Sequence, residues 1–359
     1  MNAKDRMILA EFREQRPAFT ALGDTVHNLL KSLVKSAGIE LLSIEHRVKA
    51  EDSLKGKLER KGDRYRSLED LTDILGARVI CFFNDDVDAV GKLIEENFVI
   101  DWENSCDKRA DIKADTFGYL SLHYICSLAP DSGYPAEICG KKFEVQIRTV
   151  LQHAWAAINH DTGYKSEFGV PRVVVREFSR VAGLLEIADD EFVRIRNRMT
   201  DYVEEIRQKI TDNCAENVLI DALSLKEYIR RNVRMREFLE QLAAVCGAEI
   251  QEIDPESYLE QLRWLGKKTL GDLQRMMEDN HDLAFTLAKQ ALSVTDLDIL
   301  SSNIGLRYLC RAELYNKNYT PEQAADFLYL SVKDTDRSAR QAKSLYDSCR
   351  KALEAQANG

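Results

Sequence analysis

The sequence predicts an α+β protein, with a mixed central β-sheet flanked by helices over residues 1–200 and an all-helical region over 201–359. Short β-branched or aromatic runs separated by polar turns predict the strands. Apolar residues at helical spacing predict helices before, between and after these runs. From residue 150 onward the helical spacing continues almost without a break. A chain of 359 residues therefore suits a sheet-containing domain followed by a helical one.

The elements of the first region follow in a clear order. Helices are expected over 5–36, 39–60 and 85–97, and strands over 77–83, 98–103, 122–128 and 142–149. After the last strand, residues 151–165 are expected to form another helix.

A long helix with a narrow apolar seam is expected further on. Nine apolar residues alternate in steps of three and four over four heptads, namely Phe178, Val181, Leu185, Ala188, Phe192, Ile195, Met199, Tyr202 and Ile206. We expect this seam to pack within the chain, against Leu219, Leu223, Leu225 and Ile229, with self-association as the alternative. Another helix is expected to start at Pro321, with Thr320 as its N-cap.

Composition limits the possible partners. The chain has 50 Lys and Arg against 60 Asp and Glu, a net charge of -10, and neither half is basic. Bulk attraction to nucleic acid or an anionic membrane is therefore not expected, and any polyanion site must be local. Eight cysteines without close spacing indicate reduced thiols in a cytoplasmic protein. No signal peptide and no membrane span are expected.

One local basic site is present within residues 46–66. Lys49, Ser53 and Lys57 are four residues apart, so on a helix they would share one face and could offer two ammonium groups and a hydroxyl to a polyphosphate. A solvated helix face is the alternative interpretation. Asp73 lies at the start of an apolar strand, where a carboxylate can hold Mg²⁺ against a phosphate or simply form a turn.

Two further segments carry candidate site residues. In FGYLSLHY (117–124), Tyr119 could stack on a base and His123 could reach a phosphate. In KFEVQIRT (142–149), Glu144, Gln146 and Arg148 alternate with apolar residues. A strand face made of acid, amide and guanidinium is costly in a buried sheet unless it lines a site.

In their order and spacing, four motifs resemble the synthetase domain of the RelA/SpoT family, the GTP pyrophosphokinases that make the alarmones ppGpp and pppGpp. They are HRVKAEDSLKGKLERK, LTDILGARVI, GYLSLHY and EVQIRT, within about residues 40–166. The resemblance implies a nucleotidyltransferase-like synthetase domain of the small, synthetase-only type with a helical C-terminal extension.

The resemblance also implies a reaction and residue roles. The family moves the β,γ-pyrophosphoryl group of ATP to the ribose 3′-hydroxyl of GDP or GTP. By motif, Asp73 and Glu144 would coordinate Mg²⁺, and Glu144 would activate the hydroxyl. The donor ATP would be held by Arg47, Lys49, Ser53 and Lys57, with Arg47 packed on adenine. The acceptor would be held by Tyr119, Arg78, His123, Gln146 and Arg148, with Tyr119 stacked on the base.

The chain departs from the family pattern beside the acceptor. Asp115 stands where the family has Lys, and Phe117 where it has Asn. Some toxin members that share an FGY loop modify the tRNA 3′ end or adenine nucleotides, so such an acceptor is the alternative, and tRNA is a partner only in that case. In the helix expected after the last strand, Ala157 and Asn159 stand where acidic residues are common in the family.

Two other functions are disfavoured by the sequence. A non-enzymatic nucleotide sensor is disfavoured because Asp73, Glu144 and Lys49 are intact. The dipeptide His160–Asp161 stands alone, so we interpret it as structural and expect no hydrolase activity. The sequence predicts neither the oligomeric state nor the role of residues 201–359.

Overall fold

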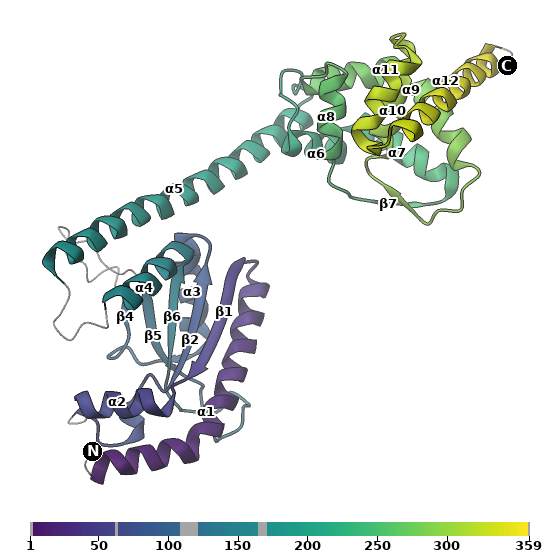
Figure 1. Cartoon of the computed structure of the whole chain (residues 1–359). Helices are drawn as coiled ribbons and strands as arrows, with labels where there is room; N and C mark the ends of the chain where they lie inside the picture. The colour runs from purple at the N-terminus through teal and green to yellow at the C-terminus, as the bar shows by residue number, and fades with distance from the viewer. Residues whose placement is uncertain (1–2, 62–63, 108–120, 164–170, 358–359) are drawn as a thin grey trace. The chain divides into compact units, whose positions relative to one another are not determined.

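The computed structural model describes residues 3–61, 64–107, 121–163 and 171–357. Its contacts divide the chain into two compact units, Met1–Arg196 and Asn197–Gly359 (Figure 1). Each unit has its own hydrophobic core, and each is described by itself.

The first unit contains a sheet with helices around it, as predicted. Its elements are α1 (Ala3–Ser36), β1 (Leu41–Val48), α2 (Glu51–Lys61), the 3₁₀ turn η2 (Leu68–Asp70), β2 (Leu75–Cys81), α3 (Asn84–Asn97), β3 (Val99–Ile100), β4 (Cys106–Asp107), β5 (Leu122–Ser127), β6 (Phe143–Thr149) and α4 (Val150–Gly163). The predicted strand at 98–103 is thus only two residues long.

The sheet is mixed, which confirms the predicted fold class. Its order is β1-β2-β6-β5-β3, with β4 paired to β5. β2 and β6 run parallel, whereas β1–β2 and β5–β6 are antiparallel. Alternate residues of β6, Phe143, Val145 and Ile147, are fully buried in a core shared with α1 and α3. The other face of the central strands is therefore left for polar side chains.

The expected helix over 39–60 is wrong in its first part, because residues 41–48 form β1 and only 51–61 form α2. Leu41, Ile44 and Val48 are three and four residues apart, which imitates a helical stripe. A register shift between Leu41 and Ser43 breaks the two-residue alternation of this edge strand. The strand therefore lacks the clean pattern by which strands are recognised.

The second unit is mainly helical. It holds the C-terminal part of α5 (Arg172–Thr211), followed by α6 (Ala222–Arg231), α7 (Val233–Cys246), α8 (Ser257–Trp264), α9 (Leu270–Leu292), α10 (Ile304–Asn316), α11 (Pro321–Val332) and α12 (Thr335–Ala357). The prediction that this region is all-helical needs one correction. Two short strands, β7 (Glu249–Gln251) and β8 (Ile299–Ser301), form a parallel pair. α11 starts as predicted, with the Thr320 hydroxyl accepting a hydrogen bond from the Gln323 N–H.

The α5 seam packs within the chain as expected only at its C-terminal end, where Ile206 is 1% exposed and lies in the same core as Leu225 and Ile229. Phe192, Ile195 and Met199 are 47%, 50% and 53% exposed. Leu225 and Ile229, two of its four expected partners, are buried in the core of the second unit, and Leu219 is 65% exposed. Leu223 is half-buried. The expected partners therefore cover the end of the seam at Ile206, whereas its middle part remains at the surface.

The cysteines are free thiols, and several lie in the cores. Burial raises the pKa of Cys81 to about 12, so this thiol is protonated at neutral pH. Among the described helices, none combines the length and apolarity that crossing a membrane requires.

Candidate active site

Strand register aligns the polar residues of four strands in two rows. In one row, Glu45 of β1 pairs with Arg78 of β2, Arg78 with Gln146 of β6, and Gln146 with His123 of β5. In the neighbouring row, Arg47 pairs with Gly76 and Gly76 with Glu144. Residues two apart on a strand point to the same face, so both rows belong to the face opposite the apolar core.

At the end of β1, two lysines contact one aspartate. Lys49 follows β1 directly, and its N–H donates to the carbonyl of Ile74 at 2.8 Å, which places it beside the start of β2. Lys49 Nζ lies 2.5 Å from Asp73 Oδ2, and Lys57 Nζ of α2 lies 2.8 Å from Asp73 Oδ1. Lys57 also lies over the ring of Tyr65. The predicted phosphate-binding lysines thus converge on the predicted metal ligand.

Burial and hydrogen bonding act in opposite directions on the pKa values of Asp73 and Lys57. Burial opposes ionisation of Asp73, but the hydrogen bonds from both lysines outweigh it and lower the pKa of the carboxyl. Burial likewise disfavours the charged form of Lys57, and the bond to Asp73 outweighs it and raises the pKa of the amine. Asp73 and Lys57 are therefore both charged at neutral pH.

The prediction that Lys49, Ser53 and Lys57 share one helix face is wrong for Lys49. α2 begins at Glu51, so Lys49 lies in the link between β1 and α2 and is not helical. Only Ser53 and Lys57 share a helix face. Lys49 reaches the same place because β1 ends beside Asp73.

Glu144 is held by two hydrogen bonds from neighbouring strand positions. His123 Nδ1 lies 2.8 Å from Glu144 Oε1, and Gln146 Nε2 donates to Glu144 Oε2 at 2.9 Å. Arg148 Nη2 in turn donates to Gln146 Oε1 at 2.5 Å. Burial disfavours the Glu144 carboxylate, but the bond to His123, aided by Gln146, lowers its pKa. Glu144 is therefore an oriented, ionised carboxylate.

A cleft of about 430 Å³ joins these groups. Of the predicted site residues it is lined by Arg47, Lys49, Ser53, Asp73, Arg78, Glu144 and Gln146. Arg47 and Ser53 are exposed at its rim. Three other predicted site residues contact residues that line the cleft. Lys57 contacts Asp73, His123 contacts Glu144, and Arg148 contacts Gln146.

His153 of α4 was not predicted as a site residue. Burial and the charges of Arg148 and Arg78 lower the pKa of this imidazole, so it is neutral at pH 7. Its Nδ1 is buried and has no hydrogen-bond partner among the described residues. Two arginines and an imidazole next to the polar rows are suited to an anion such as phosphate. The signal in the sequence was its position five residues after Arg148, at the start of the next helix.

The carboxylates of Asp73 and Glu144 both line the cleft. The charge of Asp73 weakly opposes the lowering of the Glu144 pKa, so the two carboxylates interact across this space. In the described part of the chain, no cluster of three or more His, Cys, Asp or Glu is arranged to hold a metal ion. Mg²⁺ is commonly held by one or two carboxylates plus substrate phosphates, and this pair fits such a site.

Several acceptor-side predictions lie outside the described residues. Tyr119, Asp115 and Phe117 all fall in 108–120. His160 and Asp161 belong to α4, although their side chains are not described.

The fold and the cleft define a class of enzyme-like site: a mixed sheet that presents paired carboxylates between clusters of cations, as transfer of a phosphate-containing group requires. Residues 46–169 match the family model described as "Region found in RelA / SpoT proteins". The GTP pyrophosphokinase YwaC of Bacillus subtilis (strain 168) is 30% identical over 162 residues, which cover 44% of this chain and 75% of that protein. YjbM, another GTP pyrophosphokinase of this organism, is 29% identical over 161 residues, covering 43% and 72%. The chain belongs to the RelA/SpoT family.

Solved structures are also similar to this chain. Small alarmone synthetase 2 from Bacillus subtilis is 26% identical, covers 52% of this chain and 97% of its own, and has a TM-score of 0.44. A GTP pyrophosphokinase family protein from Streptococcus pneumoniae is 28% identical, with coverage of 54% and 96% and a TM-score of 0.44.

Proposed function

We propose that this chain is a GTP pyrophosphokinase that transfers the pyrophosphoryl group of ATP to the ribose 3′-hydroxyl of GDP or GTP. The observation that carries the proposal is the placement of Asp73 and Glu144 in one cleft, with lysines on the Asp73 side and a relay of polar groups on the Glu144 side. Its relatives YwaC and YjbM are GTP pyrophosphokinases.

The donor half of the site consists of Arg47, Lys49, Ser53 and Lys57. The two ammonium groups that now contact Asp73 can also bind phosphate oxygens of ATP, which are anionic acceptors of the same kind. Ser53 adds a hydroxyl at the rim, and the exposed guanidinium of Arg47 can stack on the adenine ring.

The acceptor half consists of Arg78, His123, Gln146 and Arg148, with Tyr119 as the base-stacking residue. Arg78 and Arg148 bring positive charge to the acceptor phosphates. His153 belongs to this half by its position next to both arginines. His123 and Gln146 act on the acceptor through Glu144, because they fix the carboxylate that faces the 3′-hydroxyl.

The chemistry breaks a phosphoanhydride bond of ATP and forms a phosphoester bond to the acceptor. The 3′-oxygen attacks the β-phosphorus of ATP, the bond from that phosphorus to the α,β-bridging oxygen breaks, and AMP leaves. The hydroxyl proton passes to Glu144, whose lowered pKa keeps it ionised before the reaction. Asp73 and Glu144 would hold Mg²⁺, which would supply charge neutralisation for the triphosphate.

The acceptor is decided by a labelling experiment. Purified chain is incubated with Mg²⁺ and γ-labelled ATP, together with GDP, GTP, an adenine nucleotide or deacylated tRNA in separate reactions. We expect labelled ppGpp from GDP and pppGpp from GTP. Label transferred to tRNA or to the adenine nucleotide, and not to GDP or GTP, would identify the alternative acceptor. Transfer to none of the four would refute the proposed activity.

The stacking role of Tyr119 has its own test. Tyr119→Ala should raise the KM for the acceptor by the loss of about 1–3 kcal/mol of base stacking, whereas the KM for ATP should stay unchanged. Tyr119→Phe keeps the ring and is the matched control. Equal effects of Tyr119→Ala on both substrates would contradict the assignment.

A further inference from the structure

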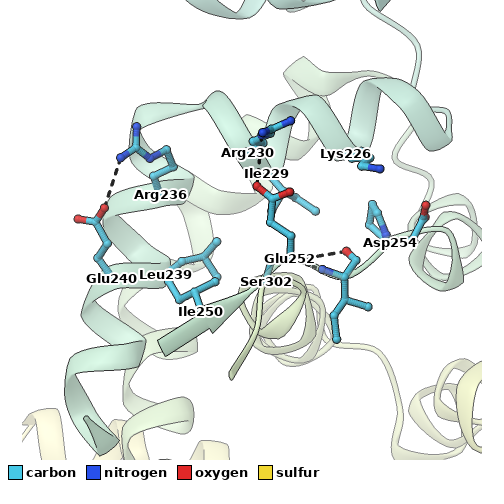
Figure 2. A pocket seen from close by; sticks show the side chains of 12 residues that line it. Lys226, Ile229, Arg230, Arg236, Leu239, Glu240, Ile250, Glu252, Asp254 and Ser302 are labelled. Carbon is cyan, nitrogen blue, oxygen red and sulfur yellow. Dashed lines mark hydrogen bonds and ion pairs between the residues drawn. The ribbon is translucent and has the colours of Figure 1, made fainter. Parts of the chain in front are cut away.

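The second unit contains a cleft that the proposed reaction does not use. It has a volume of about 320 Å³ and lies between α6, α7 and the segment from β7 to Pro255 (Figure 2). Figure 2 shows side chains of both helices and of this segment around one hollow. Its wall therefore includes a β-strand as well as helices.

The strand β7 presents an unused hydrogen-bonding edge. Glu249 N–H donates to the Asp298 carbonyl at 2.8 Å, and Ser302 N–H donates to the Gln251 carbonyl at 2.9 Å. In a parallel pair, residues alternate between facing the partner strand and facing away from it. The N–H and C=O of Ile250 therefore point away from β8. β7 ends a two-stranded sheet, and all three of its residues are exposed.

Apolar side chains form a base on which an added strand could pack. Ile250 pairs with Leu300, which is 3% exposed and belongs to the same core as Leu239. Paired residues point to the same face of a sheet, so Ile250 lies on the face that packs on the helices. A strand next to β7, at the usual spacing of about 4.8 Å, would extend this face over Ile229 and Leu239.

Charged groups surround the base, and one cation is available to a ligand. Arg230 Nε lies 3.2 Å from Glu252, and Arg236 lies 3.6 Å from Glu240. Asp254 accepts a hydrogen bond from the N–H of Glu256. Lys226 also lines the cleft, and no ion pair or hydrogen bond joins its amine to another described residue. A carboxylate on the ligand would therefore complement Lys226.

We propose that this cleft binds an extended peptide of another protein, added to β7 as a third strand. The backbone of the peptide pairs with the N–H and C=O of Ile250, an apolar side chain packs on Ile229 and Leu239, and an acidic residue contacts Lys226. Strand addition to an exposed sheet edge is a mode in which backbone bonds give affinity and side-chain pockets give specificity. This gives the second unit a binding role that does not depend on the proposed catalytic activity.

The decisive variant is Ile250→Pro. Proline removes the Ile250 N–H, which points away from β8, while the bonds that join Glu249 and Gln251 to the β8 segment remain. Ile250→Thr keeps the N–H and a β-branched side chain and is the matched control. Circular dichroism and thermal unfolding should show that both variants keep the parent fold.

The probe is a random heptapeptide library displayed on phage and selected on the immobilised full chain. We expect enriched peptides with alternating apolar residues and an acidic residue. Synthesised with a fluorescent label, they should bind Ile250→Pro at least about tenfold more weakly than the parent, and Ile250→Thr within about threefold. Lys226→Glu should weaken the same peptides.

Two results would overturn the proposal. One is selection that enriches no peptide, and the other is enriched peptides that bind parent and Ile250→Pro equally well, which would place them elsewhere on the chain. Hydrogen exchange supplies an independent readout. The Ile250 amide should exchange rapidly in the free chain and slow on peptide addition, and an unchanged rate in a saturated complex would also overturn the proposal.

Discussion

A buried carboxyl that contacts the end of β6 predicts a pH-dependent stability of the first unit. Asp189 of α5 is 2% exposed, and its Oδ2 accepts a hydrogen bond from the Thr149 hydroxyl at 2.7 Å. Its Oδ1 is buried with no hydrogen-bond partner in the described part of the chain. Burial raises the pKa of Asp189 to about 6, with a smaller contribution from the charge of Asp190, against the opposing effect of Thr149. The fold therefore favours the protonated form.

The size and sign of the effect follow from the shift. The pKa rises from 3.8 to about 6, and one pKa unit corresponds to about 1.4 kcal/mol, so the full effect is about 3 kcal/mol. Because the folded-state pKa is the higher one, this stabilisation is present below the unfolded-state value and is lost as pH rises through about 6. Relative to Asp189→Asn, the parent should lose about 2.4 kcal/mol of stability between pH 4 and pH 8, because at pH 4 the unfolded-state carboxyl is already more than half ionised.

Urea unfolding across this pH range is the assay. Trp102 and Trp155 lie in the first unit, so a Trp264→Phe background restricts tryptophan fluorescence to that unit. The Asp189→Asn substitution also changes the free energy of unfolding by an amount that does not depend on pH. This amount cancels when the difference between parent and variant at pH 4 is compared with the difference at pH 8. A difference between parent and Asp189→Asn that stays constant from pH 4 to pH 8 would refute the reasoning.

Three other predictions concern the cleft and α5. Glu144→Gln should reduce pyrophosphoryl transfer by about 10²–10⁴-fold with an unchanged fold by circular dichroism, and near-normal turnover would remove Glu144 from the mechanism. Lys57→Ala should raise the KM for ATP more than the KM for the acceptor. Lys55→Ala changes an exposed lysine of the same helix and should leave both KM values unchanged. Equal increases in both KM values for Lys57→Ala would argue against a donor-side role. Ile195→Asp should change the free energy of unfolding by less than about 0.5 kcal/mol, because this side chain is 50% exposed, and a midpoint lowered by several degrees would mean that the seam is covered.

The central strands and the polar face of β6 could be predicted from the sequence because their pattern is local. Glu144 and Gln146 alternate with residues that are fully buried, and this alternation is visible in the sequence. β1 could not be predicted, since a register shift at an edge strand removes the alternation on which the prediction depends. The long helix α5 was predicted by its seam, but spacing alone does not tell which partner covers an apolar stripe.

The contacts within the site depend on strand order, which the sequence does not contain. β6 lies between β2 and β5, so Gln146 has Arg78 on one side and His123 on the other. The same order explains why His153 was missed: its relation to Arg78 exists only once β6 and α4 lie beside β2.

The strand order also has a consequence for how activity appears during folding. The two rows of polar residues draw on segments from Glu45 to Gln146, and the parallel β2–β6 pair joins residues about seventy positions apart. Contacts of such separation form slowly, because a long loop must close before they yield any stabilisation. Helical signal can therefore return early in refolding, whereas the nucleotide cleft is completed only when β6 inserts beside β2. Recovery of activity would then occur late in refolding and would show that β6 has paired with β2 in the first unit.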